Sequence, residues 1–263
     1  MLRKANLGVS TVLSTAILTS VLCIIVFTAS YVANDAINGQ IENAQFDQAK
    51  NVMLALDKLI KRLVYKPESS GYVKTSFWTV TPYFTETGEK LEVWIDGNRT
   101  LEVPVNVVKI KGGPRTSVAT PQNLIGNDTL LLTKISGSLG WVHTYQSAGA
   151  WIELNYSRIR CINAGTMQYF NGTGYEPYNF IEITIVKIIF KDFEVQEQAS
   201  FTVRNAGLVP IQKEMEAGDF TIRVQKSGGA SDECTLSDLE GITNYKTLIN
   251  LVVVNIEISL EGG

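Results

Sequence analysis

Side chains that could do chemistry are scarce in this chain of 263 residues. The only histidine, His143, stands next to Val142 and Thr144 in a strand-like segment, where a lone histidine usually has a structural role. No Walker loop, GxSxG elbow or GxGxxG fingerprint follows a strand-like run, and no CxxC pair suggests a zinc site. We therefore expect no enzymatic activity, no metal and no cofactor.

Carboxylates are the remaining catalytic resource. Asp192 with Glu194, and Asp232 with Glu233, are close in sequence but lack the spacing of a calcium loop. A membrane-tethered hydrolase would need such groups to converge in a pocket, whereas solvated faces are the commoner arrangement.

The sequence contains more candidate sites for covalent modification than for catalysis. Four Asn-x-Ser/Thr sequons without a central proline are candidates for N-glycosylation, at Asn98, Asn127, Asn155 and Asn171. Of the three cysteines, Cys23 lies in an apolar run, while Cys161 and Cys234 lie far downstream. The latter two either form one disulfide or remain buried thiols, because spacing alone does not show that they meet.

The net charge of −3, from 23 basic and 26 acidic residues, offers no field that would attract nucleic acid. A nucleic-acid partner is not expected.

An uncharged apolar run near the amino terminus dominates the organisation of the chain. Leu7 to Ala33 contains no charged residue, histidine or proline, follows Arg3 and Lys4, and precedes Asp35. The run is long enough for a transmembrane helix, and nearly twice the apolar core of a secretory leader, which is roughly 7 to 15 residues. The preceding basic residues predict a cytoplasmic amino terminus and an external remainder.

One face of this run is small and weakly polar, with Gly8, Thr11, Thr15, Thr19 and Cys23 along it. Such a face lets helices approach closely, so we expect packing against copies of the same helix. A monomeric anchor of ordinary Ser/Thr content is the alternative.

The helical pattern continues past the apolar run. Ile37, Ile41, Ala44, Val52 and Leu59 belong to an apolar stripe at steps of three and four residues. We expect a membrane-spanning helix over 6–34 that continues as an amphipathic helix over 35–66, on the order of 90 Å long in total.

From residue 72 to 263 the pattern changes to strand-like runs separated by turn residues. Strands are expected at Phe77–Phe84, Leu91–Ile95, Leu101–Ile110, Thr129–Ile135, Trp151–Cys161, Phe180–Val195, Phe220–Gln225 and Lys246–Leu260. Asp96-Gly97-Asn98 predicts a hairpin turn. The fold class is therefore α+β, with a long amino-terminal helix followed by an antiparallel β-sandwich-like domain.

The amino-terminal residues resemble those of archaeal type IV pilin-like proteins, the superfamily of adhesive pilins and archaellins. Lys4-Ala5-Asn6 matches their class III leader pattern, and Gly8-Val9-Ser10-Thr11-Val12-Leu13 is similar to the opening of their apolar helices. The resemblance implies a leader over 1–5, cleavage between Ala5 and Asn6 by a membrane peptidase, and a filament core built from the apolar helices. It also implies an assembly ATPase and a platform protein as partners.

The leading functional hypothesis is a pilin-like structural subunit. It begins as a membrane-anchored precursor and ends in an extracellular filament of copies of itself, with a glycosylated β-domain for adhesion or surface contact. The alternative is a single-pass anchored extracellular binding protein that never polymerises.

Overall fold

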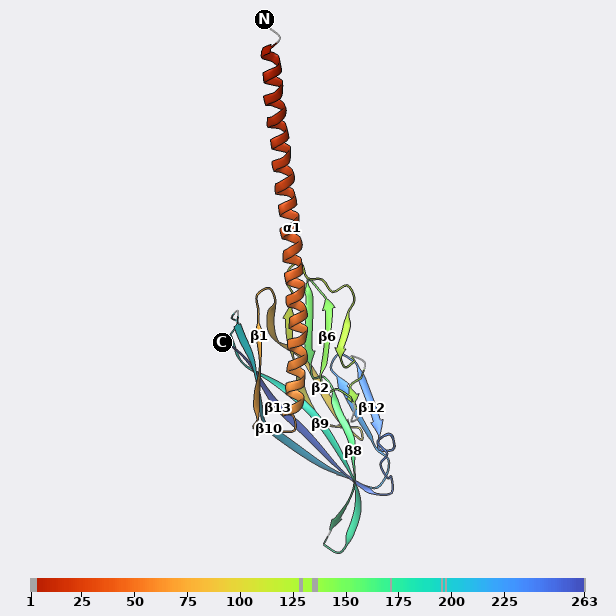
Figure 1. The fold of residues 1–263 in the computed structure, drawn as a ribbon. Coiled ribbons are helices and arrows are strands. Elements are labelled where there is room, and N and C mark those ends of the chain that lie inside the picture. Colours follow the sequence, from red (N-terminus) through yellow and green to blue (C-terminus); the bar gives the residue numbers. More distant parts are fainter. Residues whose placement is uncertain are drawn as a thin grey trace.

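The computed structural model describes residues 4–127, 130–133, 137–170, 172–194, 196 and 198–262, with side chains from residue 12 onward. A helix, α1 (Lys4–Leu63), precedes a β-domain and projects far beyond it (Figure 1). At 1.5 Å per residue, its 60 residues span about 90 Å. The fold class is α+β, as predicted.

The helix runs without interruption because no proline occurs before Pro67, and Gly39 is accommodated within it. Lys61 and Arg62 lie in its last turn, where positive charge complements the helix dipole. It ends at Leu63, slightly before the predicted end at residue 66, and the first strand begins at Ser70 instead of residue 72.

One sheet has the order β1-β10-β13-β9-β8-β5 among the described residues. Its strands are β1 (Ser70–Ser76), β5 (Leu132–Thr133), β8 (Ile159–Phe170), β9 (Tyr175–Phe193), β10 (Gln198–Met215) and β13 (Lys246–Gly262). We call it sheet A. Neighbouring strands are antiparallel except for β13 with β9 and β5 with β8, which run parallel.

The second sheet, sheet B, has the order β12-β11-β2-β3-β7-β6-β4 and is antiparallel throughout its described strands. Its strands are β2 (Thr81–Ile95), β3 (Asn98–Lys111), β4 (Gln122–Ile125), β6 (Trp141–Gln146), β7 (Ala150–Asn155), β11 (Thr221–Lys226) and β12 (Ser231–Thr235). A short 3₁₀ segment, η1 (Ser237–Leu239), follows β12.

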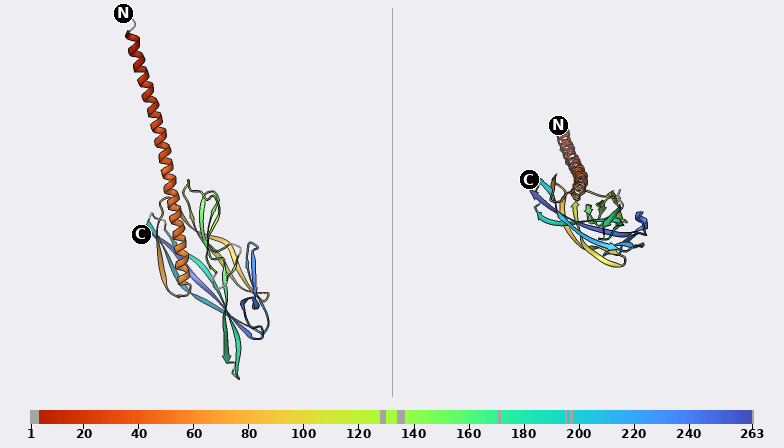
Figure 2. Two further views of the ribbon diagram at one scale, coloured as in Figure 1. Left: turned by 45° about the vertical axis from the view of Figure 1, so that its right-hand side comes forward. Right: turned by 90° about the horizontal axis from the view of Figure 1, so that it is seen from below.

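The two sheets pack directly on each other in one half of the domain and on α1 in the other. Where they pack directly, the core contains Val93 of sheet B and Ile183 of sheet A. Where α1 enters, Met53 and Leu56 of the helix are buried together with residues of both sheets, such as Ile152 and Phe201. Because both sheets line both cores, the β-domain is one unit. Seen from below, the strands curve around the side on which α1 lies (Figure 2).

The hairpin prediction is confirmed, because Asp96 and Gly97 alone connect β2 to β3 and both have positive φ, 53° and 75°. This is the backbone that a two-residue hairpin turn requires.

Four strand predictions need correction. Trp151–Cys161 is not one strand: β7 ends in sheet B at Asn155, and the chain crosses to sheet A before β8 begins. Phe77–Phe84 and Leu91–Ile95 are not separate strands, because residues 81–84 and 91–95 both belong to β2, and Phe77 to Val80 precede it. Of Thr129–Ile135, only Leu132–Thr133 is a described strand, and 129 and 134–135 lie outside the described residues.

Strand β10 was missed by the sequence reading. Strand β1 pairs with it from Gln198 to Arg204, and a bulge follows between Asn205 and Gly207. Beyond that bulge, β13 is its only described strand partner as far as Met215. The outer edge of β10 is therefore open over its second half.

Candidate assembly interface and surface sites

The first half of α1 is an apolar rod without a covering. From Val12 to Ala33 every described side chain is exposed, and Leu13, Phe27 and Tyr31 are 61%, 76% and 75% exposed. The helix is long and apolar enough to cross a membrane, although a signal sequence would meet the same test. The exposure continues past the uncharged run, because Ile37 is 55% exposed.

Several hydroxyl groups on this rod donate hydrogen bonds to the backbone of the helix itself. Thr15 Oγ1 donates to the carbonyl of Val12 at 2.9 Å, and Thr19 Oγ1 donates to the carbonyl of Thr15 at 2.8 Å. Ser20 donates likewise to Ala16, also at 2.8 Å. At Thr15 and Thr19, the described hydroxyls of the predicted small face therefore need no second helix as a hydrogen-bond partner. The small face would favour helix packing because its side chains are small, which lets a second helix approach closely.

The residues predicted for leader processing stand at the start of α1. The backbone of Lys4, Ala5 and Asn6 is helical. Their side chains, the side chain of Thr11 and the surroundings of Gly8 lie outside the described part of the chain. Cys23 is exposed on the rod, as are Thr15 and Thr19.

A loop of the β-domain contains Arg115 and binds α1 at the point where the side chains of the helix begin to be buried. Arg115 Nε donates to Asp35 at 2.8 Å, and Arg115 Nη1 donates to Glu42 at 3.0 Å. The backbone N–H of Arg115 donates to the other carboxylate oxygen of Glu42 at 2.6 Å. The carboxylates of Asp35 and then Glu42 raise the pKa of Arg115. This contact marks the boundary between the free and the docked half of the rod.

A buried carboxylate joins the docked half to the domain. Asp57 is 1% exposed, accepts a hydrogen bond from the hydroxyl of Tyr156 at 2.8 Å, and pairs with Lys61 Nζ at 2.6 Å. Burial, followed by the charge of Asp57, raises the pKa of Tyr156 well above its ordinary value. The backbone of Gly140 lies so close that an added Cβ would clash with Asp57 Oδ1. The attachment of α1 to the β-domain at Asp57 therefore combines an ion pair, a hydrogen bond and a close approach of the backbone.

The four sequons differ in accessibility. Asn98 is exposed in the β2–β3 hairpin, and Asn127 is exposed as well. Asn155 is 2% exposed at the end of β7 and accepts a hydrogen bond from the hydroxyl of Ser157 at 2.9 Å. A glycan on Asn155 does not fit this folded domain. Asn171 lies outside the described residues.

The two downstream cysteines come together. Cys161 of β8 is buried, Cys234 of β12 is half-buried, and both line one cleft between the sheets. Both carry free thiols in the structure. Sequence spacing could not show this contact, because it depends on how the two sheets close.

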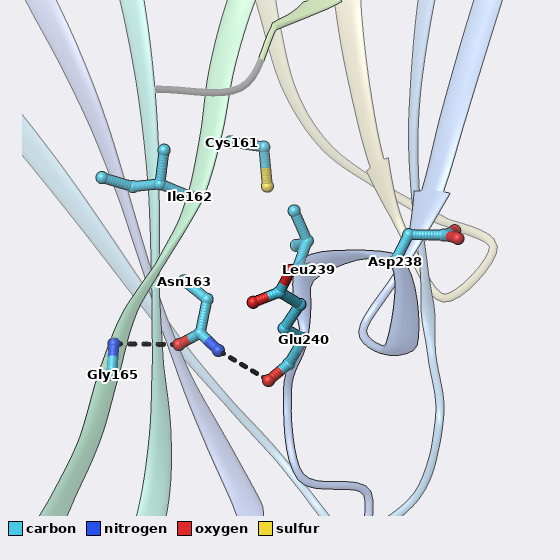
Figure 3. A pocket seen from close by; sticks show the side chains of 7 residues that line it. All are labelled: Cys161, Ile162, Asn163, Gly165, Asp238, Leu239 and Glu240. Atoms are coloured by element: carbon cyan, nitrogen blue, oxygen red, sulfur yellow. Dashed lines mark hydrogen bonds between the residues drawn. The ribbon is translucent and has the colours of Figure 1, made fainter. Parts of the chain in front are cut away.

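Two acidic residues, Asp238 and Glu240, are among those that line a cleft of about 250 Å³ next to Cys161. The carboxylate of Asp238 accepts hydrogen bonds at 2.8 Å from the backbone N–H and the hydroxyl of Thr235, and it points away from the cleft (Figure 3). Across the described residues, no group of three or more metal-ligating side chains gathers.

A row of rings lies on one face of β6 and was missed by the sequence reading. His143 stacks on Trp141 with ring centroids 3.7 Å apart, and Tyr145 follows at 5.3 Å. Lys109 lies 3.0 Å from Glu153 and faces the ring of Tyr145. Burial and then the charge of Glu153 raise the pKa of Tyr145. The spacing of two residues along a strand, which puts side chains on one face, was the available signal.

A second aromatic surface lies at the end of the molecule opposite the amino terminus (Figure 1). There the β8–β9 hairpin exposes Tyr169, Phe170 and Tyr175, at 56%, 56% and 72%. At its base, Tyr178 donates a hydrogen bond to Glu214 at 2.7 Å, which raises the pKa of Tyr178 to about 12.

No protein-family model, curated protein or solved structure matches the chain, so its pilin-like architecture, a long apolar helix followed by β-sheets, rests on its own structure.

Proposed function

We propose that the chain is a structural subunit of an archaeal type IV pilus-like surface filament, assembled through the free half of α1. The observation that carries this proposal is the rod itself, which leaves its apolar side chains exposed from Val12 to Ala33 and buries none against the domain. Water would oppose such exposure at roughly 25 cal/mol for each Å² of apolar surface, so the rod needs lipid or protein around it.

The length of the apolar surface supports protein as its final surroundings. A bilayer is crossed by about 20 residues, whereas exposed apolar side chains continue to Ile37 and Ile41, past Asp35. Neighbouring copies of α1 would cover this extra length. The small face at Thr15 and Thr19 would let the helix axes approach closely.

The proposed life of the subunit has two stages. The precursor is held in the membrane by its apolar helix, and a leader peptidase cuts between Ala5 and Asn6. A pilus assembly ATPase and its platform protein then transfer the helix into the filament, where copies of the chain replace lipid. In this proposal the β-domain has a structural and contacting role, not a catalytic one.

The outer faces of the β-domain supply surfaces for adhesion. The row from Trp141 to Tyr145 and the hairpin tip around Tyr175 each present exposed or half-exposed rings. Rings combine a large contact area with little conformational freedom, which suits recognition surfaces.

The test compares two substitutions on different sides of the rod, about 120° apart around the helix. Thr15→Leu enlarges the small face, whereas Val21→Leu enlarges the bulky one and is the matched control. We expect both to insert in the membrane, and only Thr15→Leu to reduce the number of filaments seen by negative-stain electron microscopy. Normal filaments from Thr15→Leu would show that assembly does not depend on the small face.

Processing is tested by mass spectrometry of the exported protein. We expect an amino terminus at Asn6, and replacement of Lys4 or Ala5 should leave the precursor uncut. An exported protein that retains Met1 would contradict the proposal.

A second candidate is a single-pass anchored binding protein that does not polymerise. It is favoured by the hydroxyls of Thr15, Thr19 and Ser20, which bond to their own helix and so allow the rod to lie in lipid alone. Abundant surface protein that stays monomeric, with no filaments, would support this candidate over the first.

A further inference from the structure

Two cysteines from opposite sheets meet at one edge of the β-domain. Cys161 lies on β8 of sheet A, opposite Ile183 of β9, and Cys234 lies on β12 of sheet B, opposite Ile222 of β11. Both line a cleft of about 340 Å³ between the sheets. Far apart in the sequence, they are also the only cysteines of the β-domain.

This edge is where sheet A and sheet B come together without a shared ladder of backbone hydrogen bonds among the described strands. A polar contact crosses it, in which the backbone N–H of Leu132 of β5 donates to Asp232 Oδ2 of β12 at 3.1 Å. Leu239 of η1 packs in the same core as Cys161. Figure 3 shows the sulfur of Cys161 directed toward Leu239, into the space between the sheets.

We propose that Cys161 and Cys234 form a disulfide that clamps sheet A to sheet B, formed by exchange with a small-molecule disulfide or an oxidoreductase outside the cytoplasm. The proposal goes beyond the filament function, because it concerns the covalent state of the β-domain in a single molecule. It shares with that function only the outward location of the domain.

The environment of the two sulfurs sets the order of the exchange. Cys161 is 2% exposed, and the neighbouring thiol of Cys234 together with burial raises the pKa of the Cys161 thiol, which keeps it protonated. Cys234 is half-buried and is therefore the sulfur that an outside reagent reaches first.

The exchange balances in two steps. The thiolate of Cys234 attacks the reagent's disulfide, which yields a mixed disulfide and one released thiol. Cys161 then loses its proton and attacks the sulfur of Cys234, so that the mixed disulfide breaks, the protein disulfide forms and a second thiol leaves. The two cysteines lose two protons and two electrons, and the reagent leaves as two thiols.

The test uses the full chain in detergent with Cys23→Ser, so that Cys161 and Cys234 are its only thiols. The reduced protein is incubated with oxidised glutathione. It is then unfolded in denaturant in the presence of iodoacetamide, which alkylates free thiols, and its mass is measured by mass spectrometry. We expect a monomer lighter by two hydrogen atoms than the reduced form, with neither cysteine alkylated and one cross-linked peptide joining them. Recovery of two alkylated cysteines, of a stable glutathione adduct, or of a dimer linked through Cys234 would overturn the proposal.

Thermal unfolding gives an independent measurement. Reduction should lower the melting temperature of the Cys23→Ser protein by roughly 10 °C, because the bridge closes a loop of about seventy residues. Cys234→Ser, which changes the more exposed partner, should unfold at the temperature of the reduced protein and ignore the reductant. A reductant effect of equal size in Cys234→Ser would contradict the clamp. These readouts use unassembled protein, so a failure to form filaments does not affect them.

Discussion

The hydrogen bond between Tyr156 and Asp57 should contribute measurably to the attachment of the rod. Tyr156→Phe keeps the volume of the ring and removes only the hydroxyl, which lies 2.8 Å from a carboxylate that is 1% exposed. Hydrogen bonds to charged groups contribute about 1.5 to 3 kcal/mol, and a buried carboxylate that loses a donor adds to the loss. Lys61, at 2.6 Å, still neutralises Asp57. We expect the free energy of unfolding to fall by about 2 to 3 kcal/mol.

The assay is denaturant and thermal unfolding of the full chain in detergent, followed by tryptophan fluorescence. The expected loss corresponds to roughly 5 to 10 °C in melting temperature. Tyr72→Phe is the matched control, because Tyr72 is 65% exposed. In an Asp57→Asn background, Tyr156→Phe should lower the free energy of unfolding by a smaller amount, about 0.5 to 1.5 kcal/mol, because the hydrogen-bond acceptor is then neutral. A change no larger than that of Tyr72→Phe, or one of equal size in both backgrounds, would refute the reasoning.

Three further measurements test other parts of the structure. Because the pKa of Tyr156 is raised on folding, the native protein keeps its stability below the ordinary tyrosine pKa of about 10 and loses it above, by up to about 1.4 kcal/mol per pH unit. The stability gap between the native protein and Tyr156→Phe should therefore narrow by about 1 kcal/mol between pH 9 and pH 11 in chemical unfolding, and a constant gap would contradict the shift. Leu56→Ala, at a fully buried helix position, should lower the free energy of unfolding by about 2 to 5 kcal/mol. Ile41→Ala, at a position 48% exposed, should change it by less than about 1 kcal/mol. Equal losses for the two variants in a denaturant titration would show that the helix docks differently on the domain. Asn98→Gln should remove one glycan from the mass of the exported protein without unfolding it, Asn155→Gln should remove none, and an unchanged mass after Asn98→Gln would show that site unused.

The rod and the first hairpin could be predicted because local rules determine them. An uncharged run followed by an amphipathic stripe without proline specifies a helix wherever it lies, and Asp96-Gly97 adopts the positive φ angles that a two-residue turn needs. Neither feature depends on a distant residue.

Strand β10 escaped prediction because its sequence contains two residues that usually interrupt strands. Gly207 belongs to a bulge at which the register shifts, and Pro210 pairs with Val252 of β13. Both are tolerated because the pairing with β1 has already ended at Arg204. Only the sheet order shows that this part of the strand has a free side.

The crossing between the sheets was hidden for a different reason. Trp151 to Cys161 is rich in apolar and aromatic residues, as a single strand would be, yet Tyr156 and Ser157 lie between β7 and β8. Tyr156 leaves the strand pattern to reach Asp57, a residue 99 positions away. The meeting of Cys161 and Cys234 likewise depends on two sheets closing over a shared core, and no local pattern encodes such a contact.

The open edge of β10 has a consequence for crowding. In the proposed filament, subunits held side by side at high local concentration could join their sheets by adding strand to strand, a route to irreversible aggregation. Pro210 pairs with Val252 of β13 but has no backbone N–H. A proline is tolerated in an edge strand where the N–H would face away from the neighbouring strand, so the open edge of β10 lacks one hydrogen-bond donor at this position. Lys213 adds a charge further along the same strand. An incoming strand would find an interrupted template there, so that neighbours could be packed closely through their rods while their β-domains stay separate.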